Sequence, residues 1–327
     1  FQFGQLADLI MLDTRLHGRD KGLEYATDLP LRSQLYDISE PDNVRAISEQ
    51  DAVKLPDTGL QRINVPFDMK QGKAKPILDY DVISQLEADS LPEGWQYLPD
   101  IEGFIDGPLS AKERTLLGDD QEQWLRQALQ QSQRRGSTWQ IIGQQVLMGR
   151  LFIPALSDED LQLETLSKSR VSRLKPMQAM AGTGLPFNLD AWDGYPQCRA
   201  RVQADLLRYA ANPVILAGDT HSSWAFDLHD DQKNRVGVEV GTPGISSPGM
   251  DSYLPVQPDI LQAAFLDSSP ELVEVETQNR GWAEVEFTPK SMRTRWHYVS
   301  SVLDRNYAVT TSQPLVCRAG ERAFSNT

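Results

Sequence analysis

The sequence has few cysteines, no long apolar run and no excess of positive charge. Its 327 residues include 2 cysteines, fewer than a clustered zinc site requires. No apolar run approaches the roughly 20 residues of a membrane-spanning helix. There are 32 Lys and Arg residues against 46 Asp and Glu residues, for a net charge of −14. Proteins that bind a nucleic-acid backbone need a basic face, so we expect a globular chain with no nucleic-acid partner.

Two common hydrolase and nucleotide-binding motifs are also missing. The chain has no Gly-x-Ser-x-Gly sequence, so the nucleophile elbow of a serine hydrolase is not predicted. The glycine-rich stretch 181–186 is not followed by Gly-Lys-Ser/Thr at the start of a helix, so it does not predict a phosphate-cradling loop.

The most informative stretch of the sequence is 213–228. Val214 to Ala217 form a short apolar run typical of a buried strand, and Gly218 permits a turn or a close approach of the backbone. Asp219 and His221 follow at once, where α/β sheets place their functional sites. Carboxylate oxygen and imidazole nitrogen are ligands of zinc, iron and manganese. The alternative is a turn aspartate beside a hydrogen-bonded loop histidine.

A second strand-like run, 4–13, also ends in polar residues. Arg15 follows it, and its planar guanidinium suits a bidentate contact with phosphate. The alternative is an arginine that pairs with Asp13 or Asp20 to hold the loop.

The middle of the chain predicts helices and strands in alternation. A helix is expected from Asp119, as N-cap with Glu122 as its capping-box partner, to a stop at Gly136. A buried strand, 139–146, ends in Gln144 and Gln145, for which core hydrogen bonding is favoured over ligation of a hard cation such as Ca²⁺. A further helix is expected from Pro196 to Asn212.

The remaining segments differ in their pattern of apolar and polar residues. Residues 21–105 show no long helical period and are interpreted as an insertion or lid, and residues 155–185 as a polar connection. Beyond His221 the pattern alternates in the period of half-buried strands, at 225–228, 236–240, 272–276, 282–287 and 293–299, with a hairpin turn at 288–291.

Several of these stretches resemble one known family in the family's own order. They are Leu12-Asp-Thr-Arg15, Leu117-Gly-Asp-Asp-Gln121-x-x-Trp124, Trp139-Gln-Ile-Ile-Gly-Gln-Gln145-Val, Trp192-Asp-Gly-Tyr195 and Gly218-Asp-Thr-His-Ser-Ser-Trp224. Together they resemble alkaline phosphatase D (PhoD-type), a branch of the calcineurin-like metallophosphoesterases, and they reach from Phe1 to about Val302.

This resemblance implies a metallophosphoesterase-like fold, a two-sheet α/β sandwich with mixed sheets and outer helices. It implies hydrolysis of small phosphate monoesters or diesters by two metal ions, drawn from Fe, Ca, Zn or Mn. Asp219 and His221 would be metal ligands, with Arg15 and Asp193 as further site residues; the alternative for the Asp193 segment is a packing turn. A periplasmic or secreted location is also implied. Cys198 and Cys317 are either two buried thiols or one disulfide, and such a location would permit the disulfide.

The sequence departs from the family pattern at its start. The family places a Gly-Asp metal motif and an Asn-Asp-His motif before the Leu-Asp-Thr-Arg segment. Neither upstream motif is found in this chain, whose Gly-Asp pairs at 118–119 and 218–219 belong to the later matched segments. We therefore expect residues 1–327 to correspond to the carboxyl-terminal two-thirds of such an enzyme and, alone, to lack metal-dependent hydrolysis. The alternatives to a phosphatase are a phospholipase-D-like phosphodiesterase and an incomplete, inactive fragment.

Overall fold

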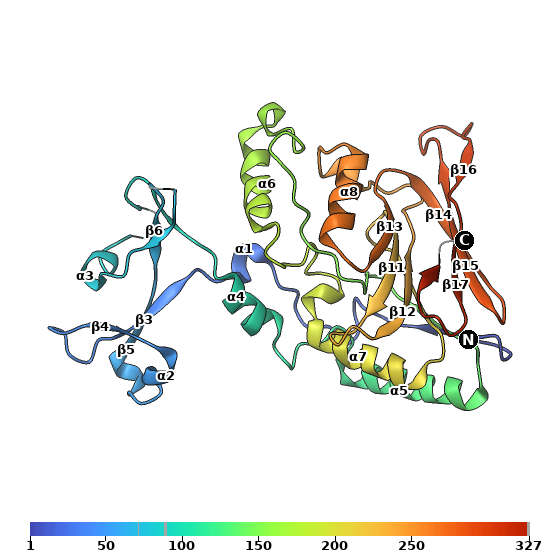
Figure 1. Ribbon diagram of the computed structural model, residues 1–327, viewed down its shortest axis with the longest axis horizontal. Coiled ribbons are helices and arrows are strands. Elements are labelled where there is room, and N and C mark those ends of the chain that lie inside the picture. The colour runs from blue at the N-terminus through green and yellow to red at the C-terminus, as the bar shows by residue number, and fades with distance from the viewer. Residues whose placement is uncertain (71, 88–89, 326–327) are drawn as a thin grey trace. The chain divides into compact units, whose positions relative to one another are not determined.

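The computed structural model describes residues 1–70, 72–87 and 90–325, which form two compact units (Figure 1). The larger unit comprises Phe1–Leu23 and Leu109–Thr327, and the smaller comprises Glu24–Pro108. None of the helices in the described residues has both the length and the apolar character needed to cross a membrane.

A seven-stranded mixed sheet is the centre of the larger unit. Its strand order is β1-β2-β9-β10-β12-β11-β13. The four central strands β2, β9, β10 and β12 are parallel, and the other three pair antiparallel. The strands are β1 Gln2–Phe3, β2 Ala7–Met11, β9 Trp139–Gly143, β10 Pro213–Ala217, β11 Ser223–His229, β12 Arg235–Gly241 and β13 Leu272–Glu276.

A second sheet of five strands is antiparallel throughout and packs on one face of the first. It contains β14 Arg280–Phe287, β15 Ser291–Val299, β16 Val309–Thr311, β17 Leu315–Arg318 and β18 Phe324–Ser325. Between the sheets lies one apolar core, which includes Trp139, Val214, Val238 and Trp296. The expected two-sheet sandwich is therefore confirmed.

Helices cover the opposite face of the seven-stranded sheet. They are α5 Gly118–Arg135, α6 Lys168–Met180, α7 Pro196–Tyr209 and α8 Pro258–Ser268, with short turns η3 Leu163–Thr165, η4 Trp192–Gly194 and η5 Met250–Ser252. Helices α5 and α7 lie side by side below the sheet (Figure 1). A second apolar core lies between these helices and the seven-stranded sheet. It includes Leu125 and Leu129 of α5 and Leu206 of α7.

Helix α5 ends as predicted but begins differently. Gly136 has φ 69° and closes the helix. Asp119 is not the N-cap, because the helix begins at Gly118, whose backbone N–H donates to Thr115 Oγ1 at 2.9 Å. Glu122 does not close a capping box either: it is buried and accepts from Arg201 Nη2 at 2.7 Å. The local capping pattern was overridden by this tertiary ion pair.

The polar connection expected at 155–185 was wrong in part, because α6 occupies Lys168–Met180. Its apolar residues Val171, Leu174 and Met177 recur every third position and pack, partly buried, against the core under the helices. The surrounding Lys, Arg and Ser residues, with Pro176 inside the helix, obscured that period in the sequence.

The smaller unit contains short helices, turns and strands, and its buried apolar residues include Leu35, Tyr36, Val65 and Phe67. Two three-stranded sheets have the orders β4-β3-β5 and β7-β6-β8. The elements are α1 Tyr25–Asp28, β3 Ser33–Asp37, β4 Arg45–Ile47, α2 Glu49–Ala52, η1 Asp57–Gly59, β5 Leu60–Asn64, β6 Pro66–Asp68, β7 Lys75–Pro76, α3 Tyr80–Ile83, β8 Trp95–Tyr97 and α4 Ile101–Phe104, with η2 Ile105–Leu109 at its end. These bounds lie close to the expected insertion 21–105; its function as a lid stays a prediction.

The two cysteines are free thiols on opposite faces of the central sheet. Cys198 belongs to the core under α5 and α7, and Cys317 to the core between the sheets. The sheet therefore separates them, and the disulfide alternative is wrong.

This placement predicts slow thiol chemistry. Burial raises the pKa of each thiol to about 11. The thiolate is the reactive form, so at pH 8 only about one thiol in a thousand is reactive in the folded protein. We expect both to react slowly with a disulfide reagent at pH 8 and both to react at once after unfolding in guanidinium chloride. A count of zero thiols in the unfolded, unreduced protein would contradict the structure.

Candidate functional site

Four loops meet at one edge of the seven-stranded sheet because four parallel strands end there. Met11 of β2 pairs with Gly143 of β9, and Gly143 with Leu216 of β10. Ala217 of β10 pairs with Gly241 of β12. The residues that follow each strand therefore lie along one edge, as expected for sites of α/β sheets.

Asp219 and His221 both adopt left-handed backbone conformations just beyond β10. Their φ angles are 63° and 56°, which non-glycine residues rarely adopt and which concentrate at functional sites. The His221 ring contacts the Pro248 carbonyl through Nδ1 at 2.8 Å. If Nδ1 carries the proton, Nε2 keeps a lone pair, the arrangement common in metal-binding histidines.

Arg15 lies across from Asp219 on the loop after β2. Its Nη2 is 2.5 Å from Asp219 Oδ2, and its Nη1 pairs with Asp190. The alternative partners predicted from the sequence, Asp13 and Asp20, are not the ones it uses. Asp13 Oδ1 instead accepts the backbone N–H groups of Leu16 and Arg15, which lower its pKa.

Sequence reasoning missed two residues of this cluster. Arg19 pairs with the other carboxylate oxygen of Asp190 and donates to the Thr14 carbonyl at 2.9 Å. Asp190 is two residues before Trp192, outside the matched motif, and 175 residues separate it from Arg15. The spacing of Arg15 and Arg19 in one loop was the only local signal for such a cluster.

Gln144 and Gln145 fasten the loops together, as their favoured interpretation predicted. Gln145 Oε1 accepts from Thr14 N at 2.8 Å and from Thr14 Oγ1 at 2.6 Å. Gln144 Oε1 accepts from the Trp192 indole at 2.6 Å. Both amide oxygens are thus used in hydrogen bonds that fix the edge of the sheet.

Asp193 is buried away from solvent. Its side chain is 5% exposed; Oδ1 pairs with Arg199, which is 7% exposed, and Oδ2 accepts from Leu151 N at 2.9 Å. These contacts give Asp193 a structural task, in line with the packing-turn alternative. Its contact with a substrate stays a prediction.

A family model described as PhoD-like phosphatase matches residues 1–296. The chain belongs to this family. Alkaline phosphatase D of Bacillus subtilis (strain 168) is 26% identical over 222 residues, which are 65% of this chain and 32% of that protein. A solved structure described as "Structure of PhoD" has a TM-score of 0.50 and 23% identity, and the match covers 65% of this chain and 35% of its own.

The PhoD-like chain spans about a third of the length of these two relatives. The structural likeness supports the sandwich fold of the larger unit.

The donor set at Asp219 and His221 does not fit a complete two-metal centre. Across residues 1–70, 72–87 and 90–325, no group of three or more His, Cys, Asp and Glu side chains is placed to hold a metal ion. Two metal ions require more donors than one carboxylate and one imidazole. The pair is chemically suited to contribute to a metal site, and Arg15 competes for the Asp219 carboxylate.

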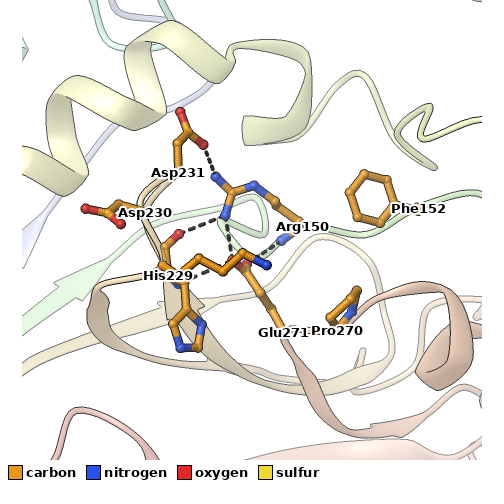
Figure 2. Close-up of a pocket in the computed structure, with 8 residues that line it drawn as sticks. Arg150, Phe152, His229, Asp230, Asp231, Pro270 and Glu271 are labelled. Atoms are coloured by element: carbon orange, nitrogen blue, oxygen red, sulfur yellow. Dashed lines mark hydrogen bonds and ion pairs between the residues drawn. The ribbon is translucent and has the colours of Figure 1, made fainter.

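A pocket lies beside the β11–β12 turn, at the opposite edge of the sheet from Asp219 (Figure 2). Arg150 points into it but is held by Glu271 and Asp231, each at 2.5 Å, and by the His229 carbonyl at 2.8 Å. The guanidinium is thereby neutralised by two carboxylates. Lys233 also lines this pocket, so its ammonium group is present there beside the paired Arg150.

Proposed function

We propose that this chain contributes to metal-dependent hydrolysis of a phosphate monoester or diester. The observation that carries the proposal is the position of Asp219 and His221 beside Arg15, at the carboxyl ends of the parallel strands. Both residues have left-handed backbone conformations. Asp219 and His221 would donate to metal, which would be Fe, Ca, Zn or Mn and would supply charge to polarise the ester. Membership of the PhoD-like phosphatase family supports this chemistry.

The protein's own residues have separable tasks in this proposal. Asp219 and His221 would hold the metal, and Arg15, which pairs with Asp219 in the structure, would bind a phosphoryl oxygen of the ester. Gln145 and Thr14 hold the Arg15 loop against β9 and so fix where the guanidinium lies. The same proposal places the protein in the periplasm or outside the cell. Its substrate would be either a phosphate monoester or a diester, of which a phospholipid is one kind.

A second candidate is a catalytically inactive member of the family. The absence of a third donor near Asp219 and His221 among the described residues favours it. Equilibrium dialysis against Zn²⁺ or Mn²⁺, together with hydrolysis of p-nitrophenyl phosphate and its bis-ester by residues 1–327, separates the two. Because residues 1–327 alone are expected to lack hydrolysis, metal binding decides between the two. Metal binding supports the enzyme, with hydrolysis that a chelator abolishes as further support, and no metal binding supports the inactive protein.

Substitution of Arg15 by lysine tests the phosphate contact. Lysine keeps the charge but loses the planar fork that binds two oxygens. We expect inhibition by inorganic phosphate to weaken about tenfold, together with a loss of turnover. The measurement is the inhibition constant of phosphate in the hydrolysis assay. Unchanged inhibition would assign Arg15 to holding Asp190 and Asp219 alone.

A further inference from the structure

Two arginines and one aspartate form a cluster whose geometry resembles an occupied anion site. Arg15 Nη1 contacts Asp190 Oδ2, and Arg19 Nη2 contacts Asp190 Oδ1. One carboxylate therefore bridges two guanidinium groups, one oxygen on each. Two oxygens of a phosphate group can make the same pair of contacts, with more negative charge.

The two arginines differ in how firmly the fold holds them. Arg19 is 10% exposed and donates to the Thr14 carbonyl, and its guanidinium lies 5.2 Å from the centre of the Tyr195 ring. Tyr195 is itself fixed, because its hydroxyl donates to the Asp20 carbonyl at 2.9 Å. Arg19 therefore stays in place whether or not Asp190 is beside it.

Asp190 is held less firmly. Its side chain is 49% exposed and lies in the segment between α6 and η4, outside any helix or strand. An ion pair with so exposed a carboxylate contributes little to stability, so the Asp190 side chain can leave at small cost. Its backbone carbonyl also accepts from Arg19 at 3.1 Å, a contact that the side chain does not supply.

We propose that Asp190 is an internal stand-in for the anion and that phosphate binds between Arg15 and Arg19 by displacing its side chain. This inference rests on the proposed function, which it deepens by naming Arg19 as a binding residue and Asp190 as the competing group. The carboxylate keeps the two guanidinium groups apart and aligned until a phosphate ester or the phosphate product replaces it.

The test is phosphate binding to residues 1–327, measured by isothermal titration calorimetry in buffer that contains EDTA. Without metal, bound phosphate reports on the arginines and no turnover occurs. We expect Asp190→Asn to bind inorganic phosphate about tenfold more tightly than the parent chain, because the competing charge is gone. Arg19→Gln in the same background should cancel that gain.

Asp231→Asn is the matched control. Asp231 is also an exposed aspartate paired with a partly buried arginine, Arg150, but it lies in the pocket beside the β11–β12 turn. It should leave phosphate affinity unchanged, which excludes a general effect of net charge. Circular dichroism verifies folding, and Asp190→Ser repeats the test if the asparagine variant does not fold.

Phosphate affinity that stays equal or falls in both Asp190 variants would overturn the inference, as would an equal gain in Asp231→Asn. These outcomes are distinct from failure of the proposed function. Tighter phosphate binding without any metal binding by Asp219 and His221 would sustain the anion site and contradict the enzyme. Metal-dependent hydrolysis, with phosphate affinity unchanged in the Asp190 variants, would support the proposed function and contradict the anion site.

Discussion

Replacement of His221 by alanine is expected to lower metal affinity by about 100-fold or more and to abolish any metal-dependent hydrolysis. Loss even of groups that orient a ligand costs about 10–100-fold in metal affinity, and His221 is proposed as a ligand itself. The ring is held at Nδ1 by the Pro248 carbonyl, so its removal also frees the loop that follows β12. Competition with a chelating dye measures the affinity, and the hydrolysis assay measures the activity.

His17→Ala is the matched control for this experiment. His17 lies exposed on the Arg15 loop and has no assigned ligand role, so its loss should leave metal affinity unchanged. Wild-type metal affinity in His221→Ala would remove His221 from the metal site. Equal losses in both variants would point to non-specific binding by surface histidines.

Substitution of Arg199 by leucine is expected to destabilise the larger unit by about 3–5 kcal/mol. It leaves the Asp193 carboxylate buried without its countercharge, and an unpaired buried charge is costly. The leucine also removes a contact of Arg199 with the Met148 carbonyl. Guanidinium chloride unfolding gives the free energy of unfolding. Arg295→Leu, which removes a more exposed pair with Glu284, should cost about 1 kcal/mol or less.

The companion variant Asp193→Asn separates the two interpretations of Asp193. A structural aspartate predicts loss of stability, because the asparagine cannot neutralise Arg199. A stable Asp193→Asn protein that binds metal but no longer hydrolyses esters would instead support the interpretation that Asp193 contacts the substrate. Stability close to wild type in Arg199→Leu would show that this ion pair contributes little.

Local patterns predicted the elements of the larger unit well. The apolar run before Gly218, the helix that starts at Pro196 and the strands beyond His221 depend on local patterns, and the structure confirms them. The predicted half-buried alternation holds in β14 and β15, but it was wrong for β11 and β12, which are buried on both faces between the second sheet and the helices. Asp119 failed as a cap because Thr115 and the Glu122–Arg201 pair decide how α5 begins. The Thr115 contact is local, but the Glu122–Arg201 pair joins residues 79 positions apart, which no local period reveals.

By itself, the sequence determined the strand before Asp219, the position of Asp219 and His221 at its end, and the family resemblance, since each depends on residues adjacent in the chain. Only the tertiary structure decided what these residues touch. Parallel pairing of β2, β9 and β10 carries Arg15 to Asp219, and the loop before η4 brings Asp190 between Arg15 and Arg19. The layers of the fold also bury Asp193 and place Cys198 and Cys317 in different cores. The central sheet lies between the two cysteines, and their spacing in the sequence does not reveal this.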